Sequence, residues 1–206
     1  MRQVTGKTNP PESGYKVSIQ QSLDGHSFSC SPLPDPTGDE TTLEVEVCSA
    51  RTVLAPAEYF ESAKAAALLA AEGISPAGDE AVVWSDPAAE LVAVMALPRT
   101  ILEQLAARFG TRIRYTAPLL AGPDAVENCV WVLSRSSLLY VKVYAREGQL
   151  QLAEVITAPD EAEIRYFFER LAAAFPLAEY GLQAAGDDPK RLCRLIGHLF
   201  KNTTCA

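Results

Sequence analysis

The segment "YKVSIQQSLDGHSFSCSP", residues 15–32, places apolar and polar residues alternately on both sides of Asp24-Gly25. The apolar positions are Tyr15, Val17, Ile19, Phe28 and Cys30. Alternation with a period of two predicts half-buried strands. An Asp-Gly pair favours a two-residue hairpin turn, because both residues tolerate positive φ. The segment therefore predicts an opening β-hairpin, and its turn raises the question of whether it holds a ligand.

The composition of the chain predicts a soluble, cytoplasmic protein. Its 206 residues are 48% hydrophobic, which is enough for a substantial core. Lysine and arginine number 18 against 26 acidic residues, a formal net charge of −8 that disfavours a nucleic-acid partner. No stretch approaches the roughly 18 consecutive apolar residues of a membrane helix. The first residues lack the apolar core of a signal peptide.

Five cysteines are scattered along the chain without a CxxC pair, at positions 30, 48, 129, 193 and 205. An odd, dispersed set predicts reduced thiols, most of them acting as small apolar core residues. With only two histidines, the sequence gives no metal-ligand spacing, and we expect no metal site. Trp84 and Trp131, both in apolar runs, are expected to anchor the cores of the two halves.

The first half of the chain alternates predicted strands and helices. Residues 1–14 form a loose tail and 15–118 a first subdomain. After the hairpin, the proline-rich residues 31–42 predict a wide connection, because proline lacks the amide donor that a sheet requires. Strands are then expected at 42–49, 80–86, 90–97 and 111–116, with helices at 56–73 and 98–109.

The second half repeats this organisation. After a linker at 119–126, a second subdomain spans 127–202, and 203–206 form a short tail. Residues 127–157 predict a three-strand meander, with turns at Arg135-Ser136 and Glu147-Gly148. An amphipathic helix follows to Phe175, then an extended piece at 179–186 and a last helix capped by Asp187 or Asp188.

Each half thus offers three meandering strands, a helix, a strand and a second helix. Strands alternating with helices predict α/β sheets covered by helices, and two such units in tandem would leave a cleft between them. The repeat is one of pattern, because the two halves share no residue-level identity.

The stretch "VSIQQSLDGHSF" (17–28) resembles the opening of a bacterial family of uncharacterised proteins with an actin-like ATPase fold. That family is distantly similar to the pilus-assembly protein PilM. Further matches follow in order: "TVLAPAEYF" (52–60), "AVMALPRTILEQL" (93–105), "LLYVKVYAREGQLQLAEVIT" (138–157), "DEAEIRYFFERL" (160–171) and "GDDPKRLCRLIGHLF" (186–200). The resemblance covers nearly all of 15–202. It implies a duplicated ribonuclease-H-like fold and brings no assigned activity.

Actin-like ATPases hold phosphates in one hairpin turn from each half, typically with Asp and a Gly two residues later. Here Asp24 is followed by Gly25 and then His26, so the glycine is displaced. The second turn, around Ser136, contains neither aspartate nor glycine. The adenosine-side loop retains a single glycine, Gly186, followed by two acidic residues that suit helix capping better than phosphate binding.

Asp24, Gly25, Ser136 and Gly186 are therefore the candidate cofactor-binding residues only if a nucleotide binds. No P-loop, GxSxG, HExxH or GxGxxG motif occurs. A His26–Cys30 or His26–Ser27 dyad is less plausible than an exposed turn histidine. The alternating Glu40, Glu44 and Glu46 predict a solvated sheet face.

The sequence predicts a non-enzymatic binding or scaffold protein with degenerate phosphate turns, no catalytic residues and no obligatory cofactor. Its expected partner is another protein, with neither nucleic acid nor membrane involved. The alternative is a nucleotide-binding protein or ATPase with rearranged ligands, using ATP and magnesium. A small-molecule site in the cleft is a third option.

Overall fold

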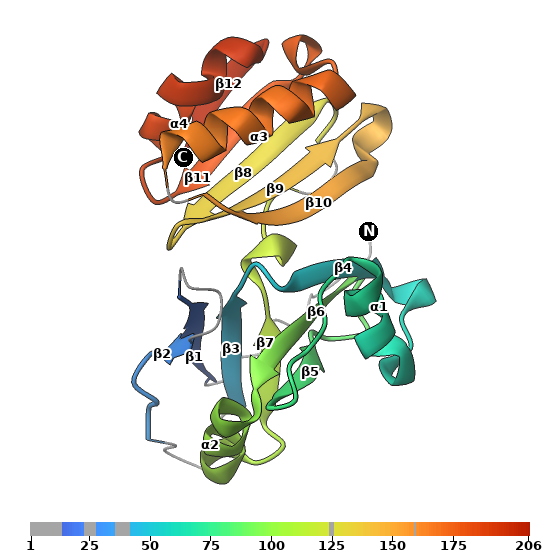
Figure 1. The fold of residues 1–206 in the computed structure, drawn as a ribbon, viewed down its shortest axis with the longest axis vertical. Helices are drawn as coiled ribbons and strands as arrows, with labels where there is room; N and C mark the ends of the chain where they lie inside the picture. The colour runs from blue at the N-terminus through green and yellow to red at the C-terminus, as the bar shows by residue number, and fades with distance from the viewer. Residues whose placement is uncertain (1–13, 23–27, 36–41, 124–125, 159) are drawn as a thin grey trace, which may run out of the picture.

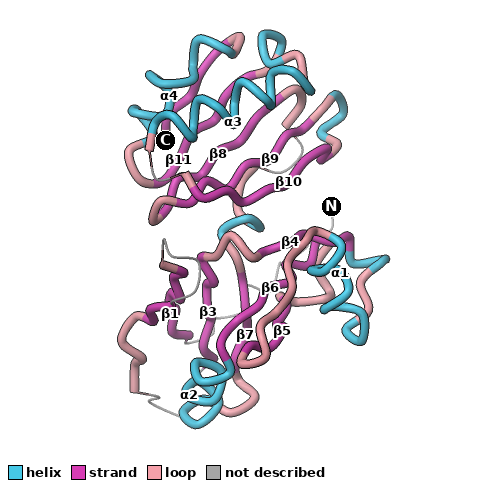
Figure 2. The backbone as a smooth tube through the Cα atoms, viewed as in Figure 1, coloured by secondary structure: helices cyan, strands magenta, loops and turns pink. Residues whose placement is uncertain are grey.

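The computed structural model describes residues 14–22, 28–35, 42–123, 126–158 and 160–206. Two α/β halves lie one above the other in Figure 1, with the second half, in yellow to red, at the top. Figure 2 shows the strands gathered into sheets at the centre of each half, with helices against them. The predicted α/β class is confirmed.

The first sheet has the strand order β2-β1-β3-β7. Its strands are β1 (Gly14–Gln21), β2 (Phe28–Cys30), β3 (Thr42–Cys48) and β7 (Ile113–Thr116). β2 is antiparallel to β1, whereas β3 is parallel to β1 and β7 is parallel to β3. The prediction of a three-strand meander is therefore wrong here. A long connection between β2 and β3 lets the chain return parallel, which a tight hairpin turn cannot do.

A smaller sheet of order β4-β6-β5, the inserted sheet, is formed by residues that lie between β3 and β7 in the chain. It is antiparallel throughout. Its strands and the helices of this half are β4 (Thr52–Pro56), β5 (Glu80–Trp84), β6 (Leu91–Pro98), α1 (Ala65–Ala71) and α2 (Arg99–Phe109). The predicted strands at 80–86 and 90–97 and the helix at 98–109 are confirmed, with Gly110 at φ 58° after the helix.

The predicted helix at 56–73 is wrong in its first half. Pro56 ends β4, an outer strand where a missing amide donor is tolerated, and two single 3₁₀ turns follow before α1 begins at Ala65. Alanine-rich composition is only a weak preference, and pairing of Pro56 with Leu91 overrides it.

The second half contains one five-stranded sheet, the second sheet, of order β10-β9-β8-β11-β12. Its elements are β8 (Cys129–Arg135), β9 (Leu138–Tyr144), β10 (Leu150–Thr157), α3 (Glu161–Ala174), β11 (Gly181–Gly186), α4 (Pro189–Ile196) and β12 (Asn202–Cys205). The predicted meander is confirmed, and so is α3, which Asp160 caps by accepting from two backbone amides. The prediction of a tail at 203–206 is wrong, because β12 pairs parallel with β11.

The two larger sheets share one plan. Each has a central first strand with an antiparallel neighbour on one side and two later parallel strands on the other, so β2-β1-β3-β7 corresponds to β9-β8-β11-β12. β10 has no counterpart among the described strands of the first sheet. The first half is therefore a shortened version of the second with a sheet inserted.

Separate apolar cores stabilise the two halves. Val45, Met95 and Phe109 belong to the core between the first sheet and α2, and Val132, Phe168 and Leu195 belong to the core beneath α3 and α4. Each of these side chains is nearly or fully buried, which stabilises the fold by about 1.5–3 kcal/mol per side chain relative to exposure.

Two cysteines form a disulfide, which corrects the prediction of reduced thiols. Cys193 on α4 and Cys205 on β12 are bonded, while Cys30, Cys48 and Cys129 are free. Spacing in the sequence gave no indication of this pair, because β12 itself was not predicted. The bond fastens the outermost strand of the second sheet to the helix that packs over it.

Candidate functional site between the two sheets

The first predicted phosphate turn lies outside the described residues. The pairing of β1 with β2 is described as far as Gln21 and Phe28. Asp24, Gly25 and His26 fall between them, in residues 23–27. Their proposed roles therefore stay predictions.

The second predicted turn is described, and its backbone amide is already occupied. Ser136 and Ser137 both have positive φ, 52° and 63°, so they form the turn one residue later than predicted. The Ser136 N–H donates to Oδ2 of Asp187 at 2.9 Å. A phosphate oxygen would use the same donor, so a carboxylate of the chain itself stands where an anionic ligand would bind.

Gly186 lies against the same turn, for a structural reason. The Asp187 N–H donates to the Ser134 carbonyl oxygen at 2.7 Å, which brings the end of β11 close to β8. A Cβ on Gly186 would lie 2.1 Å from that oxygen, and φ is +91°. The structure thus brings the predicted residues Ser136 and Gly186 together, and close backbone approach requires the glycine.

The start of α4 adds a second carboxylate beside this turn. Asp188, with φ 49°, caps the helix by accepting from the Arg191 N–H at 3.0 Å, which decides between the two predicted caps. Asp187, Asp188 and Arg191 line a cavity of about 300 Å³ with Ser136 and Ser137. The Arg191 side chain pairs with Glu161 at 3.2 Å. The cavity therefore presents two carboxylates and one cation that is already paired.

A charged group joins the two halves where β1, β3 and β8 meet. Glu46 on β3 forms ion pairs with Arg135 at the end of β8 and with Lys16 on β1, the latter at 3.1 Å. The Glu46 side chain is only 10% exposed, whereas that of Glu44, its neighbour on the same face, is 52% exposed. The prediction of a solvated face is wrong for Glu46, because Arg135 from the other half covers it.

Beside this ion pair lie two buried groups that titrate only at high pH. Burial raises the pKa of the Cys48 thiol, and burial together with the neighbouring thiol raises the pKa of the Tyr140 hydroxyl. Cys48 lies 3.6 Å from the Ser18 hydroxyl. A thiol that stays protonated is a poor nucleophile, so these residues serve packing.

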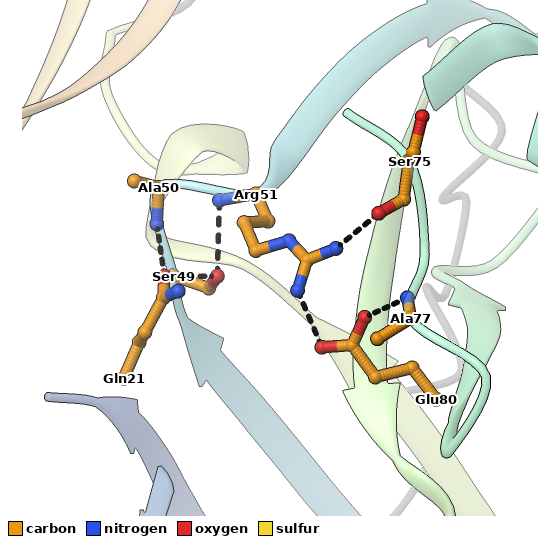
Figure 3. Close-up of polar contacts among 7 residues, drawn as sticks. All are labelled: Gln21, Ser49, Ala50, Arg51, Ser75, Ala77 and Glu80. Atoms are coloured by element: carbon orange, nitrogen blue, oxygen red, sulfur yellow. Dashed lines mark hydrogen bonds and ion pairs between the residues drawn. The ribbon is translucent and has the colours of Figure 1, made fainter. Parts of the chain in front are cut away.

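The end of β1 is fastened to the junction of β3 and β4 by a buried polar network (Figure 3). Oε1 of Gln21 accepts from the Ser49 hydroxyl at 2.7 Å and from the Ala50 N–H at 3.0 Å. Ser49 Oγ accepts from the Arg51 N–H at 3.0 Å. Gln21, the last strand residue before the predicted phosphate turn, is thus committed to a structural contact.

Arg51 continues the network into the inserted sheet (Figure 3). Its guanidinium donates to Oε1 of Glu80 at 2.5 Å and to the Ser75 carbonyl at 2.8 Å. Oε2 of Glu80 accepts from the Ala77 N–H at 2.7 Å. Because Glu80 is buried and paired, it holds the inserted sheet against the first one and is not available to a metal ion.

Apolar side chains fill the centre of the junction. Leu119, at the start of the predicted linker, packs with Trp131 and Tyr140 of the second sheet and with Leu54 of β4. Trp131 therefore lies at the junction, under the Lys142 ammonium at 5.1 Å, and not in the helix-covered core. Trp84 packs against Phe60 at 5.8 Å in the inserted sheet. These side chains fill the junction, where an open cleft between the two halves was expected.

A larger cavity, of about 780 Å³, lies beside β7 and the loop between β5 and β6. Its lining mixes charged and aromatic side chains, among them Trp84, Asp86, Glu90, Arg114 and Tyr115. It is distinct from the turn at Ser136, and the sequence gave no signal for it, since its two walls are about 30 residues apart in the chain.

Among the described residues, no group of three or more His, Cys, Asp or Glu side chains is placed to hold a metal ion. Within the same described part of the chain, no helix is long and apolar enough to cross a membrane.

The sequence matches no protein-family model and no curated protein. Among solved structures, the chain is similar to a Bacteroides thetaiotaomicron protein with an actin-like ATPase fold and unknown function. The two share 15% identity with a TM-score of 0.69, over 95% of this chain and 91% of that one. This likeness confirms the actin-like fold that the resemblance of the sequence implies.

Two weaker similarities follow. The cytoplasmic domain of EpsL, an inner-membrane component of the type II secretion system of Vibrio cholerae, gives a TM-score of 0.40 at 14% identity, over 93% of this chain and 85% of that one. A chain of the PilM–PilN type IV pilus biogenesis complex gives 0.44 at 10% identity, over 96% and 89%.

Proposed function

We propose that this chain is a non-enzymatic binding protein of the actin-like fold whose partner is another protein. The main support for this proposal is the hydrogen bond that the Ser136 amide donates to the Asp187 carboxylate. A nucleotide phosphate would have to displace a carboxylate held in place by its own backbone and by the turn. Two negative charges, on Asp187 and Asp188, also repel it within the adjoining cavity.

The closed junction supports the same proposal. Nucleotide turnover in a two-lobed protein is commonly linked to movement of one lobe against the other. Here the Glu46–Arg135 ion pair and the apolar cluster around Leu119 oppose such movement. A rigid body with a fixed surface suits a scaffold.

Isothermal titration with ATP and Mg²⁺ tests the proposal against its alternative, a nucleotide-binding protein or ATPase with rearranged ligands. We expect no saturable binding with a Kd below about 1 mM. Micromolar, Mg²⁺-dependent binding accompanied by phosphate release, both lost in Asp24→Ala, would overturn the proposal.

A second variant examines the role of Asp187 directly. Asp187→Ala frees the Ser136 amide, and we expect it to bind ATP or inorganic phosphate more tightly than the wild-type chain does. Asp86→Ala is the matched control, since Asp86 makes a comparable contact with the Ala88 amide at 2.9 Å away from this turn. Equal phosphate affinity of wild type and Asp187→Ala would show that the carboxylate does not occupy an anion site.

A further inference from the structure

A groove of about 430 Å³ runs between β10 and α3 in the second half. Leu152 and Ile156 line it from the strand, and Phe167 and Phe175 line it from the helix side. All four are only partly buried, although they adjoin the core beneath α3 and α4. Tyr166, also in the lining, is 58% exposed and stands at the rim.

The groove exists because the helices do not cover the whole sheet. In Figure 1, α3 crosses in front of β8 while β10 lies at the margin of the sheet. Residues of β8, β9 and β11 on this face are fully buried, whereas Leu152 and Ile156 of β10 are not. A further helix lying over β10, alongside α3, would complete the layer at ordinary helix spacing of about 10 Å.

Three charged side chains interrupt the apolar lining, Glu154, Glu163 and Arg170, and Arg170 donates to the Tyr166 hydroxyl at 3.4 Å. Glu154 lies between Leu152 and Ile156 on the same side of β10, because alternate residues of a strand share a face. No ion pair to Glu154 is found within the described ranges. Burial, with the negative charge of Glu72 nearby, raises its pKa. A second acid, Glu163, lines the groove from α3.

We propose that this groove binds an amphipathic helix of the partner protein, with apolar side chains against Leu152, Ile156 and Phe167 and a lysine or arginine paired with Glu154. The Glu154 carboxylate is exposed in the free chain, so a helix that covers it must supply a cation to offset the loss of water around the charge. Apolar anchors at helical spacing fill a groove of this kind. The inference rests on the proposed function and names the surface and chemistry of its partner.

The probe is a display library of helical peptides with one randomised face, selected on the full chain. We expect selected peptides to carry apolar residues three and four apart together with lysine or arginine. Tyr166→Ala and Glu154→Gln should each weaken binding by about tenfold. Tyr59→Ala and Glu169→Gln are matched controls outside the groove, and we expect them to bind as the wild type does.

A charge reversal sharpens the test. Selection on Glu154→Lys should yield acidic peptides in place of basic ones, and amide shifts in NMR spectra should map to β10 and α3. The proposal is overturned if no peptide is selected, if the peptides lack basic residues, or if Glu154→Gln leaves binding unchanged. Shifts at the Trp84–Tyr115 cavity would also overturn it yet leave the proposed function intact, which only nucleotide binding and turnover contradict.

Discussion

Arg135, the last residue of β8, forms an ion pair with Glu46 in the middle of β3. The two residues come from different sheets, so the pair fixes one half of the molecule against the other. Lys16 is a second partner of the same carboxylate, at 3.1 Å. Removing one cation therefore leaves a largely buried charge with a single remaining partner.

Arg135→Met should lower the free energy of unfolding by about 1–2 kcal/mol, because Glu46 loses a partner while its side chain stays buried. The figure allows for solvent screening of Arg135, which is 37% exposed. Urea denaturation measures the change. Arg108→Met is the control, since its partner Asp35 is 91% exposed and the pair should contribute less than about 1 kcal/mol. Equal losses in the two variants would contradict the structural role of Arg135.

Gln21→Ala should destabilise the chain by about 1–3 kcal/mol. The substitution leaves the buried Ser49 hydroxyl and the Ala50 amide without their acceptor. Thermal unfolding followed by circular dichroism reports the loss. Gln20→Ala, one residue earlier and on the opposite face of β1, should change stability little. If the two variants have the same melting temperature, the network in Figure 3 does not fasten β1.

Gly186→Ala should cost more than about 3 kcal/mol or prevent folding. A methyl group cannot approach the Ser134 carbonyl oxygen to 2.1 Å, and positive φ adds strain. The control is Gly78→Ala, where an added Cβ meets nothing within 4 Å. Soluble yield and melting temperature distinguish the two variants, and a stable Gly186→Ala protein would refute the tight approach of β11 to β8.

Cys129 should make stability fall at high pH. Burial raises the pKa of its thiol from 9.0 to about 11. The unfolded chain loses this proton near pH 9 while the folded chain keeps it, so the contribution is complete below pH 9 and is lost as pH rises to 11. The loss is at most about 2.7 kcal/mol, since one pKa unit corresponds to about 1.4 kcal/mol. Urea unfolding of wild type and Cys129→Ala from pH 8 to 11 measures it, and parallel curves would exclude the effect.

Local patterns in the sequence predicted many of the helices and strands of this fold. The alternation in residues 138–157 and the apolar stripe of α3 depend on near neighbours, and both predictions are confirmed. Predictions failed where distant segments decide the outcome. β3 pairs parallel with β1, and β12 exists only because β11 offers it an edge.

In the candidate site, too, local motifs predicted residues but not the contacts between distant parts of the chain. Ser136 and Gly186 were predicted from motif positions, and the structure places them together. The Asp187 side chain accepts from the Ser136 amide, and these two residues are 51 apart in the chain, so no local pattern indicates the contact. Alternation predicts a solvated position for Glu46, because it indicates which face of the strand a residue occupies but not what covers that face.

The inserted sheet has a consequence for the order in which the chain folds. β3 and β7 are adjacent parallel strands, yet all of β4, β5, β6 and both helices of the first half separate them along the chain. The second sheet instead begins with consecutive hairpins, β8-β9-β10, whose closing loops are short. Since pairing of distant segments is slow, we expect amides of β9 to gain protection before those of β7 in pulsed hydrogen exchange. The reverse order would mean that the insertion folds early enough to act as a template, so that the half with the more interrupted sequence would be the one that nucleates the molecule.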